Sequence, residues 1–141
     1  IQDVVYREEA RPGAPRPAPR PAPMEAAFSR TIHPTTVLLF RFSALTMNSH
    51  RIHYDRNYVT EVEGYPGLLV HGSLTQMLLL DLFRCEMPDA TLKTFAVRAN
   101  SPLYDINDFT IAGAPGPDGS SATLWALNHE GNLAMQAEAT F

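Results

Sequence analysis

A long apolar segment near the middle of the chain sets the strongest limit on its fold. Leucine, methionine and phenylalanine dominate residues 74–83, and Ser73 and Gln76 stand at the spacing of a helix capping box. The pattern predicts a helix that starts at Ser73 and ends near residues 86–89. Because this helix is apolar nearly all round, we expect it to be buried.

Two polar segments precede this helix. Residues 64–72 read Gly-Tyr-Pro-Gly-Leu-Leu-Val-His-Gly, and residues 48–55 read Asn-Ser-His-Arg-Ile-His-Tyr-Asp. A helix that begins beside Gly72 aims unpaired N–H groups and a positive dipole end at that point, which suits an oxyanion. The earlier segment supplies titratable imidazoles with amide and carboxylate neighbours. Together the two segments predict one active site.

The rest of the pattern predicts an α+β fold. An antiparallel sheet with one apolar face needs a cover, and the helix from Ser73 is the only predicted element long and apolar enough. The sheet is therefore expected to wrap round this helix. The predicted strands are residues 26–33, 92–100, 109–114, 122–128 and 133–141, with turns at 115–119 and 129–132. Two further helices are predicted, one from Pro34 to Thr46 with Val37, Leu38, Leu39, Phe42 and Leu45 toward the core, and one over 56–63 with Tyr58, Val59 and Val62 inward.

Composition excludes several classes of protein. With 141 residues, 45% of them hydrophobic, the chain is long enough for one domain with its own core. A net charge of −4 offers no basic footprint for nucleic acid, and no apolar run approaches the length of a membrane span. The single Cys85 excludes an intrachain disulfide and suits a reducing compartment. We expect a cytoplasmic protein, or a mitochondrial one in a eukaryote.

The first 24 residues differ in composition from the rest. Residues 1–10 resemble the end of a preceding unit, and residues 11–24 contain six prolines, which predicts a semi-rigid linker. An alternative for this segment is a ligand for an SH3-type domain, because its prolines recur near arginines. We expect the domain to occupy residues 25–141 and the chain to be a piece of a longer or processed protein.

The two polar segments resemble the MaoC-like, R-specific enoyl-thioester hydratases and dehydratases of the hotdog fold. The likeness is greatest to the branch that contains type 2 hydroxyacyl-thioester dehydratases and mesaconyl- and itaconyl-CoA hydratases, and it covers residues 26–141. The family's motif, Gly-Asp-x-Asn-Pro-Leu-His-x-Asp, places its histidine at His53 and its final aspartate at Asp55. Its catalytic aspartate falls on Asn48 and its asparagine on His50. An amide cannot accept a proton, so one of two bases is absent here.

The resemblance implies a hotdog domain, one half of a double hotdog, that hydrates a trans-2-enoyl thioester or dehydrates an (R)-3-hydroxyacyl thioester. The acyl group is expected to be short or branched and carried by coenzyme A or an acyl carrier. His53 is expected to move the proton, Asn48 to orient the water, and the N–H of Gly72, helped by Ser73, to stabilise the thioester oxygen. No cofactor is implied, and a second hotdog unit is the implied partner.

Other residues of the two segments have open roles. His50 is expected to support His53, by sharing its role, bonding the substrate or fixing its tautomer. Arg51 meets a substrate carboxylate or a CoA phosphate, or is an exposed arginine without such a duty. His71 is expected to shape the glycine turn, residues 64–72, or to line the substrate site. Asp55 is expected to cap the helix that follows it.

Three alternatives to a hydratase remain open on the sequence. The same scaffold supports acyl-CoA thioesterases, since fold does not determine chemistry. A second alternative is a non-catalytic half of a double hotdog, which binds acyl thioesters but does not convert them. A zinc site of His50 and His53 with Asp55 or His71 is disfavoured, because the expected substrate needs no metal.

Overall fold

The computed structural model describes residues 18–141, so the predicted end of a preceding unit and the first half of the proline segment lie outside it. Within the described residues, five strands form one sheet and the other elements are helical. None of the helices in this part is long and apolar enough to cross a bilayer. The elements are β1 (Phe28–Ile32), α1 (Thr36–Leu45), a 3₁₀ turn (Arg51–His53), a π-helical turn (Tyr58–Val62), α2 (Gly72–Glu86), β2 (Thr94–Ala99), β3 (Phe109–Pro115), β4 (Ser121–Leu127) and β5 (Leu133–Thr140).

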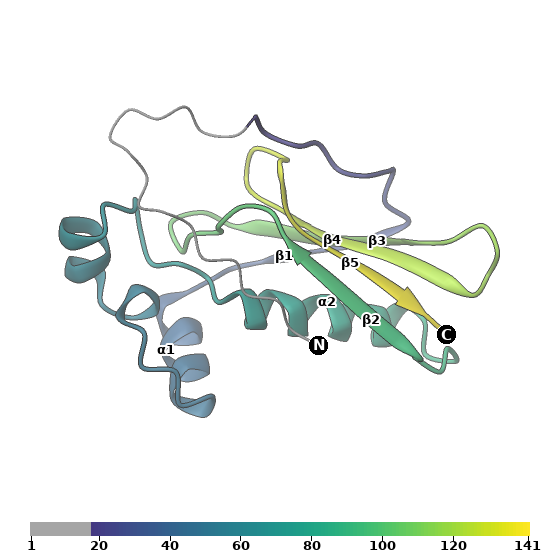
Figure 1. Cartoon of the computed structure of the whole chain (residues 1–141), viewed down its shortest axis with the longest axis horizontal. Helices are drawn as coiled ribbons and strands as arrows, with labels where there is room; N and C mark the ends of the chain where they lie inside the picture. Colours follow the sequence, from purple (N-terminus) through teal and green to yellow (C-terminus); the bar gives the residue numbers. More distant parts are fainter. Residues whose placement is uncertain (1–17) are drawn as a thin grey trace.

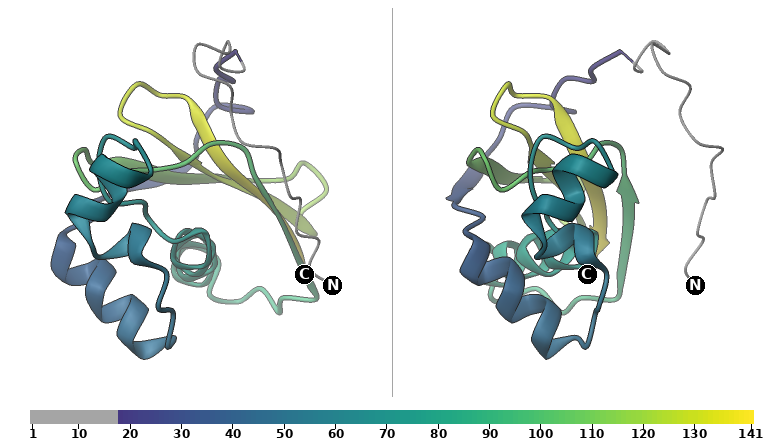
Figure 2. Two further views of the ribbon diagram at one scale, coloured as in Figure 1. Left: turned by 60° about the vertical axis from the view of Figure 1, so that its left-hand side comes forward. Right: turned by 90° about the vertical axis from the view of Figure 1, so that its left-hand side faces the viewer.

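The sheet is antiparallel throughout and curves round α2. Its strand order is β1-β3-β4-β5-β2. Although β2 and β3 are consecutive in the chain, they are not neighbours in the sheet, and β2 pairs with β5 at one edge. Figure 2 shows α2 end-on beneath the curved sheet, and α1 beside it. This arrangement confirms the predicted α+β class, the predicted strands and the sheet wrapped round the central helix.

Alternation of side chains explains why the strands pack on α2. In β5, Ala137 lies opposite Leu124 of β4 and Val97 of β2, and both Ala137 and Leu124 are buried. They belong to the same apolar cluster as Leu79 and Phe83 of α2. Residues one position away, such as Glu138, face the other side of the sheet, as the period of two requires.

The central helix differs from its prediction in two ways. It begins at Gly72 with His71 as N-cap, and that cap makes no side-chain hydrogen bond, so the predicted capping box of Ser73 and Gln76 is wrong. Burial all round is also wrong, because Met77 is 58% exposed. The sheet contacts the helix from one side only, and the buried positions are Leu74, Thr75, Leu79, Leu82 and Phe83.

The shorter helices are present, but their inner faces are narrower than predicted. Thr35 caps α1, since its hydroxyl oxygen accepts the Leu38 N–H at 3.2 Å. Leu39 and Phe42 are buried, as expected, whereas Val37 and Leu45 are exposed. In the π-helical turn Val59 is buried and Val62 is exposed, so its predicted inward orientation is wrong. Each of these helices touches the domain along a single stripe, which a hydrophobic pattern alone does not delimit. Val37, Leu45 and Val62 were thus predicted to face the core but are exposed to solvent.

A second, smaller apolar cluster lies on the opposite face of the sheet from α2. Trp125 and Leu133 are buried in it, and Ala22 packs against them. The carbonyl of Arg20 accepts the Leu133 N–H at 2.7 Å. Figure 1 shows the segment that contains Arg20 and Ala22, in dark purple, running over the face of the sheet away from α2. The last part of the proline segment thus covers this face.

The core predicts a contrast between two positions of α2. Leu79 is fully buried under the sheet, so L79A should lower the free energy of unfolding by about 2–5 kcal/mol, the range for an incompletely filled core cavity. Met77 lies on the exposed side of the same helix, and M77A should change it by less than about 0.5 kcal/mol. Urea unfolding of both variants measures the difference. Equal losses would contradict the one-sided packing of α2.

Candidate active site

The end of α1 shapes the polar loop that follows, residues 48–55. Met47 has a φ of 53°, in the left-handed region that usually favours glycine. Its N–H donates to the Ala44 carbonyl at 3.3 Å, and the Asn48 N–H donates to the Ser43 carbonyl at 2.9 Å. This pair of bonds is a Schellman motif, which closes the helix and turns the chain sharply. Asn48 therefore starts the loop with its backbone anchored to α1.

His53 joins the polar loop to the glycine turn. Its Nδ1 lies 2.8 Å from the Leu69 carbonyl oxygen, and the Leu69 N–H donates to the Ile52 carbonyl at 3.0 Å. Because a carbonyl only accepts, Nδ1 carries the hydrogen, and Nε2 of the neutral ring is the free acceptor. The predicted meeting of the two segments is present, and His53 has the tautomer that a proton acceptor at Nε2 needs.

His71 lies directly against His53. The two rings stack with centroids 3.7 Å apart and planes 18° apart. The Nε2 of His71 lies 2.8 Å from the Ser43 hydroxyl, and the Phe42 ring meets His71 edge-on at 4.8 Å. His71 is only 1% exposed, and within the described residues its Nδ1 has no hydrogen-bond partner. Since His71 immediately precedes Gly72, the stack places His53 beside the N-terminus of α2.

Burial keeps both stacked rings uncharged. Loss of solvation lowers the pKa of His53; the Leu69 hydrogen bond opposes this effect, and a charge on His50 adds to it. Burial, and then the proximity of His53, lower the pKa of His71 to about 4. Both imidazoles are therefore neutral near pH 7, and His53 is ready to accept a proton.

Asn48 and His50 lie in the same loop as His53. The ring of His50 lies 5.9 Å from that of His53, at 63°, so it neighbours His53 without stacking on it. The side-chain oxygen of Asn48 accepts the His50 N–H at 3.0 Å. That oxygen supports the loop, which leaves the amide Nδ2 of Asn48 as a hydrogen donor. Among residues 18–141 no three His, Cys, Asp or Glu side chains are grouped as for a metal ion.

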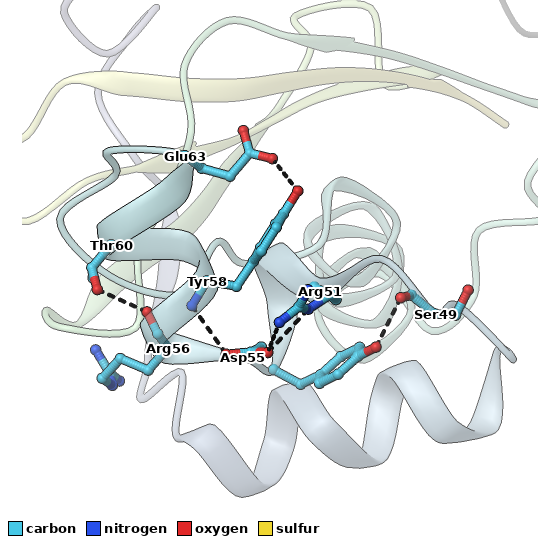
Figure 3. Close-up of polar contacts among 8 residues, drawn as sticks. Ser49, Arg51, Asp55, Arg56, Tyr58, Thr60 and Glu63 are labelled. Carbon is cyan, nitrogen blue, oxygen red and sulfur yellow. Dashed lines mark hydrogen bonds and ion pairs between the residues drawn. The ribbon is translucent and has the colours of Figure 1, made fainter.

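Figure 3 shows how the end of the loop is held. The Arg51 guanidinium donates twice to Asp55, at 3.0 and 2.7 Å, and lies over the Tyr58 ring at 4.2 Å. The Asp55 carboxylate also accepts the Tyr58 N–H at 3.0 Å, which confirms its predicted role as a helix cap. Tyr58 donates its hydroxyl to Glu63 at 2.7 Å. The charge of Arg51 is thus already paired inside the loop.

The glycine turn leaves open space at one glycine and none at another. A Cβ on Gly72 would meet only the Met135 methyl, 3.9 Å away, so the protein itself does not fill the space beside this residue. A Cβ on Gly67 would lie 2.8 Å from the carboxylate of Asp105. That carboxylate accepts the Leu68 N–H at 2.8 Å and pairs with Arg56.

Sequence reasoning missed two residues of this arrangement. Asp105 lies far along the chain and carries no local signal for its contact with the glycine turn. Ser43 did carry one, since it is a polar residue next to Phe42 on the apolar side of a predicted helix. A buried serine in such a place needs a hydrogen-bond partner, and His71 is that partner.

Two open depressions lie elsewhere on the surface. The larger, about 520 Å³, is lined by Asp105, Asp108 and His129 among others, and the smaller, about 360 Å³, adjoins it beside Glu130. Neither is lined by His53 or His71. Their carboxylates disfavour an anionic ligand, and the paired imidazoles lie elsewhere, so the histidine stack is the better candidate site.

Comparison with known proteins places this geometry in context. The family described as hydroxyacyl-thioester dehydratase type 2 matches residues 1–105. Mesaconyl-C(4)-CoA hydratase of Chloroflexus aurantiacus is 47% identical over 134 residues, which are 86% of this chain and 46% of that protein. The mitochondrial hydroxyacyl-thioester dehydratase type 2 of Schizosaccharomyces pombe is 38% identical over 73 residues, 50% of this chain and 24% of that protein. The chain spans less than half the length of both.

Solved structures show the fold. The (R)-hydratase from A. caviae involved in PHA biosynthesis has a TM-score of 0.66 and 20% identity, covering 83% of this chain and 95% of that one. The likeness confirms the hotdog fold predicted from the sequence, as a single unit with its five-stranded sheet and central helix.

The lowered pKa of His71 predicts how stability depends on pH. The unfolded chain binds a proton at this residue near its ordinary pKa of 6.5, and the folded protein only near 4. Between these values the unfolded state binds more protons, so stability is complete above pH 6.5. As the pH drops toward 4, it should fall by up to about 1.4 kcal/mol per pH unit. Urea unfolding from pH 4 to 7 measures this slope.

Variants isolate the contribution of His71 from that of the carboxylates. H71F should lose this part of the slope, whereas H129F, at an exposed turn, should keep it. An unchanged slope in H71F would contradict a buried neutral imidazole.

Proposed function

The chain belongs to the type 2 hydroxyacyl-thioester dehydratase family, and from this premise we propose that it is one half of a hydro-lyase. The reaction is the reversible addition of water across a trans-2-enoyl thioester, which yields an (R)-3-hydroxyacyl thioester. The observation that supports it most directly is the stack of His53 on His71, with His53 Nε2 free and Gly72 next in the chain.

His53 is proposed as the general base. Its Nε2 takes a proton from water as the water oxygen attacks C3 of the enoyl group, and the proton then returns to C2. Both hydrogens and the oxygen of water are thereby accounted for. Asn48 replaces the carboxylate of the family motif and orients the water by donating from Nδ2, because its oxygen is engaged by His50. His53 is then left as the base, because the other matched carboxylate, that of Asp55, is engaged by Arg51 and the Tyr58 N–H.

The N-terminus of α2 is proposed to stabilise the enolate. During the reaction the thioester oxygen gains negative charge, and the Gly72 and Ser73 N–H groups have no carbonyl partner within the helix. The open space beside Gly72 permits the carbonyl to approach the backbone. His50 supports His53 from the side, and Arg51, paired with Asp55, holds the loop that carries both.

The names of the relatives support a proposal for the substrate class. We propose a short or branched acyl group on coenzyme A, because the 47% identical relative is named as a mesaconyl-C(4)-CoA hydratase. A panel of enoyl thioesters that includes crotonyl-, mesaconyl- and itaconyl-CoA identifies the acyl group. Loss of the conjugated double bond without free thiol indicates hydration, whereas release of free thiol indicates the alternative thioesterase.

A second hotdog unit is the proposed partner. Within the described residues, β1 and β2 each have a neighbouring strand on one side only. Phe95 and Val97 of β2 are half-buried, so this edge leaves apolar surface to cover. The mesaconyl-C(4)-CoA hydratase is more than twice as long as the matched region, which leaves room for another unit of this size.

Removal of His53 tests the proposed base. H53A should lower the rate of crotonyl-CoA hydration at least about 100-fold, the low end for loss of a general base. The measurement is the absorbance of the conjugated thioester. H129A removes an exposed imidazole of the same chain and should keep the rate. A near-normal rate in H53A would refute the assignment.

Alanine at position 72 tests the approach of the thioester to the helix. The protein leaves room for the added methyl group, and alanine favours helix more than glycine does, so G72A should be at least as stable as the original protein. The methyl group occupies the space proposed for the substrate and should lower kcat/KM about tenfold or more, since small displacements of reacting groups are costly. Thermal unfolding and steady-state kinetics give the two values. Full activity in a stable G72A would place the oxyanion elsewhere.

A further inference from the structure

Ser43 connects two parts of the candidate site through one residue. Its hydroxyl lies 2.8 Å from Nε2 of His71, and its backbone carbonyl accepts the Asn48 N–H at 2.9 Å. Ser43 lies in the last turns of α1 and is 5% exposed, so water does not compete for either bond. The ring of His71 and the start of the polar loop are therefore held by the same turn of α1.

The surroundings of His71 leave it no direct access to substrate. Phe42 covers an edge of the ring, Ser43 binds Nε2, and His53 covers one face at 3.7 Å. Only 1% of the residue is exposed. A group enclosed in this way acts on a reaction through the neighbour it supports, and that neighbour is His53.

We propose that Ser43 and His71 form a positioning pair that holds the His53 ring with Nδ1 on the Leu69 carbonyl and Nε2 free, and that excludes water from its inner face. This inference rests on the proposed function only in taking His53 as the base. The Ser43 hydroxyl keeps the His71 ring in one orientation. The His71 ring is then a flat, uncharged surface on which His53 stacks.

The charges around the stack do not replace this pair. The titratable groups that face His53 are His50 on its own loop and His71 across the stack. Arg51 and Asp55 flank His53 in the loop but pair with each other. From α1 the neighbours are Phe42 and Ser43, and the first turn of α2 carries no acidic residue. Removing the tether should therefore act on His53 through solvation and orientation.

The test compares S43A, S43T and H71F by two measurements on the intact chain. The first is the NMR titration of the His53 ring, which needs no activity. The second is the pH profile of kcat/KM with crotonyl-CoA. S43A should let water reach His53, raise its titration midpoint toward the ordinary value of 6.5, and move the acid limb of the profile in the same direction. At pH 7, kcat/KM should fall about tenfold, and S43T, which keeps the hydroxyl, should recover most of it.

A double-mutant cycle tests whether the two residues act as a unit. H71F keeps a flat ring but cannot bond Ser43, so adding S43A to H71F should cause little further loss. S101A serves as control, because it deletes a hydroxyl that donates to the Leu133 carbonyl at 3.1 Å, outside the candidate site. That control should change neither measurement.

The outcomes separate this inference from the proposed function. An unchanged His53 titration in folded S43A and H71F, or additive losses in the cycle, would overturn the positioning pair. If the original protein turns over no enoyl thioester, the proposed function fails, and the NMR titration still decides the inference. If S43A does not fold, the comparison of H71F with the original protein decides it by the same titration.

Discussion

The contact on which the candidate site depends is the stack of two neutral imidazoles, His53 on His71. Three separate segments meet there: the polar loop through His53, the glycine turn through Leu69 and His71, and α1 through Ser43. A second proton in this stack would bring like charges within 4 Å of each other in a poorly solvated place. The stack therefore disfavours two charged rings at once, and burial keeps both rings neutral until His53 accepts a proton.

The rest of the domain supports features that are locally unfavourable. A buried imidazole nitrogen without a partner among the described residues costs about 1–3 kcal/mol, and Met47 adopts a backbone conformation that costs a side-chain-bearing residue about 1–2 kcal/mol. The apolar cluster between α2 and the sheet offsets such costs. Both features adjoin the proposed catalytic residues, which agrees with the tendency of strain to gather at functional sites.

Local pattern was sufficient for the elements and the sheet but not for the sides of the helices. Alternation identified β5, and the prolines and glycines of residues 115–119 and the glycine of residues 129–132 identified the antiparallel connections. The same approach misjudged Val37, Leu45 and Val62, which are exposed, and the burial of Met77. A hydrophobic residue indicates only that burial of its side chain is favourable. Whether a neighbouring layer covers it depends on the packing of segments far away in the chain.

Sequence patterns alone predicted the order of helices and strands, the antiparallel sheet, the hotdog resemblance and the two polar segments of the candidate site. These follow from short-range periodicity and from motif spacing, which are properties of neighbouring residues. The folded structure was needed to show that His71 stacks on His53, that Ser43 binds His71, and that Asp105 holds the glycine turn. Ser43 and His71 are 28 positions apart. This contact forms because α1 packs beside the start of α2. A pattern among neighbouring residues does not predict a contact between residues so far apart in the chain.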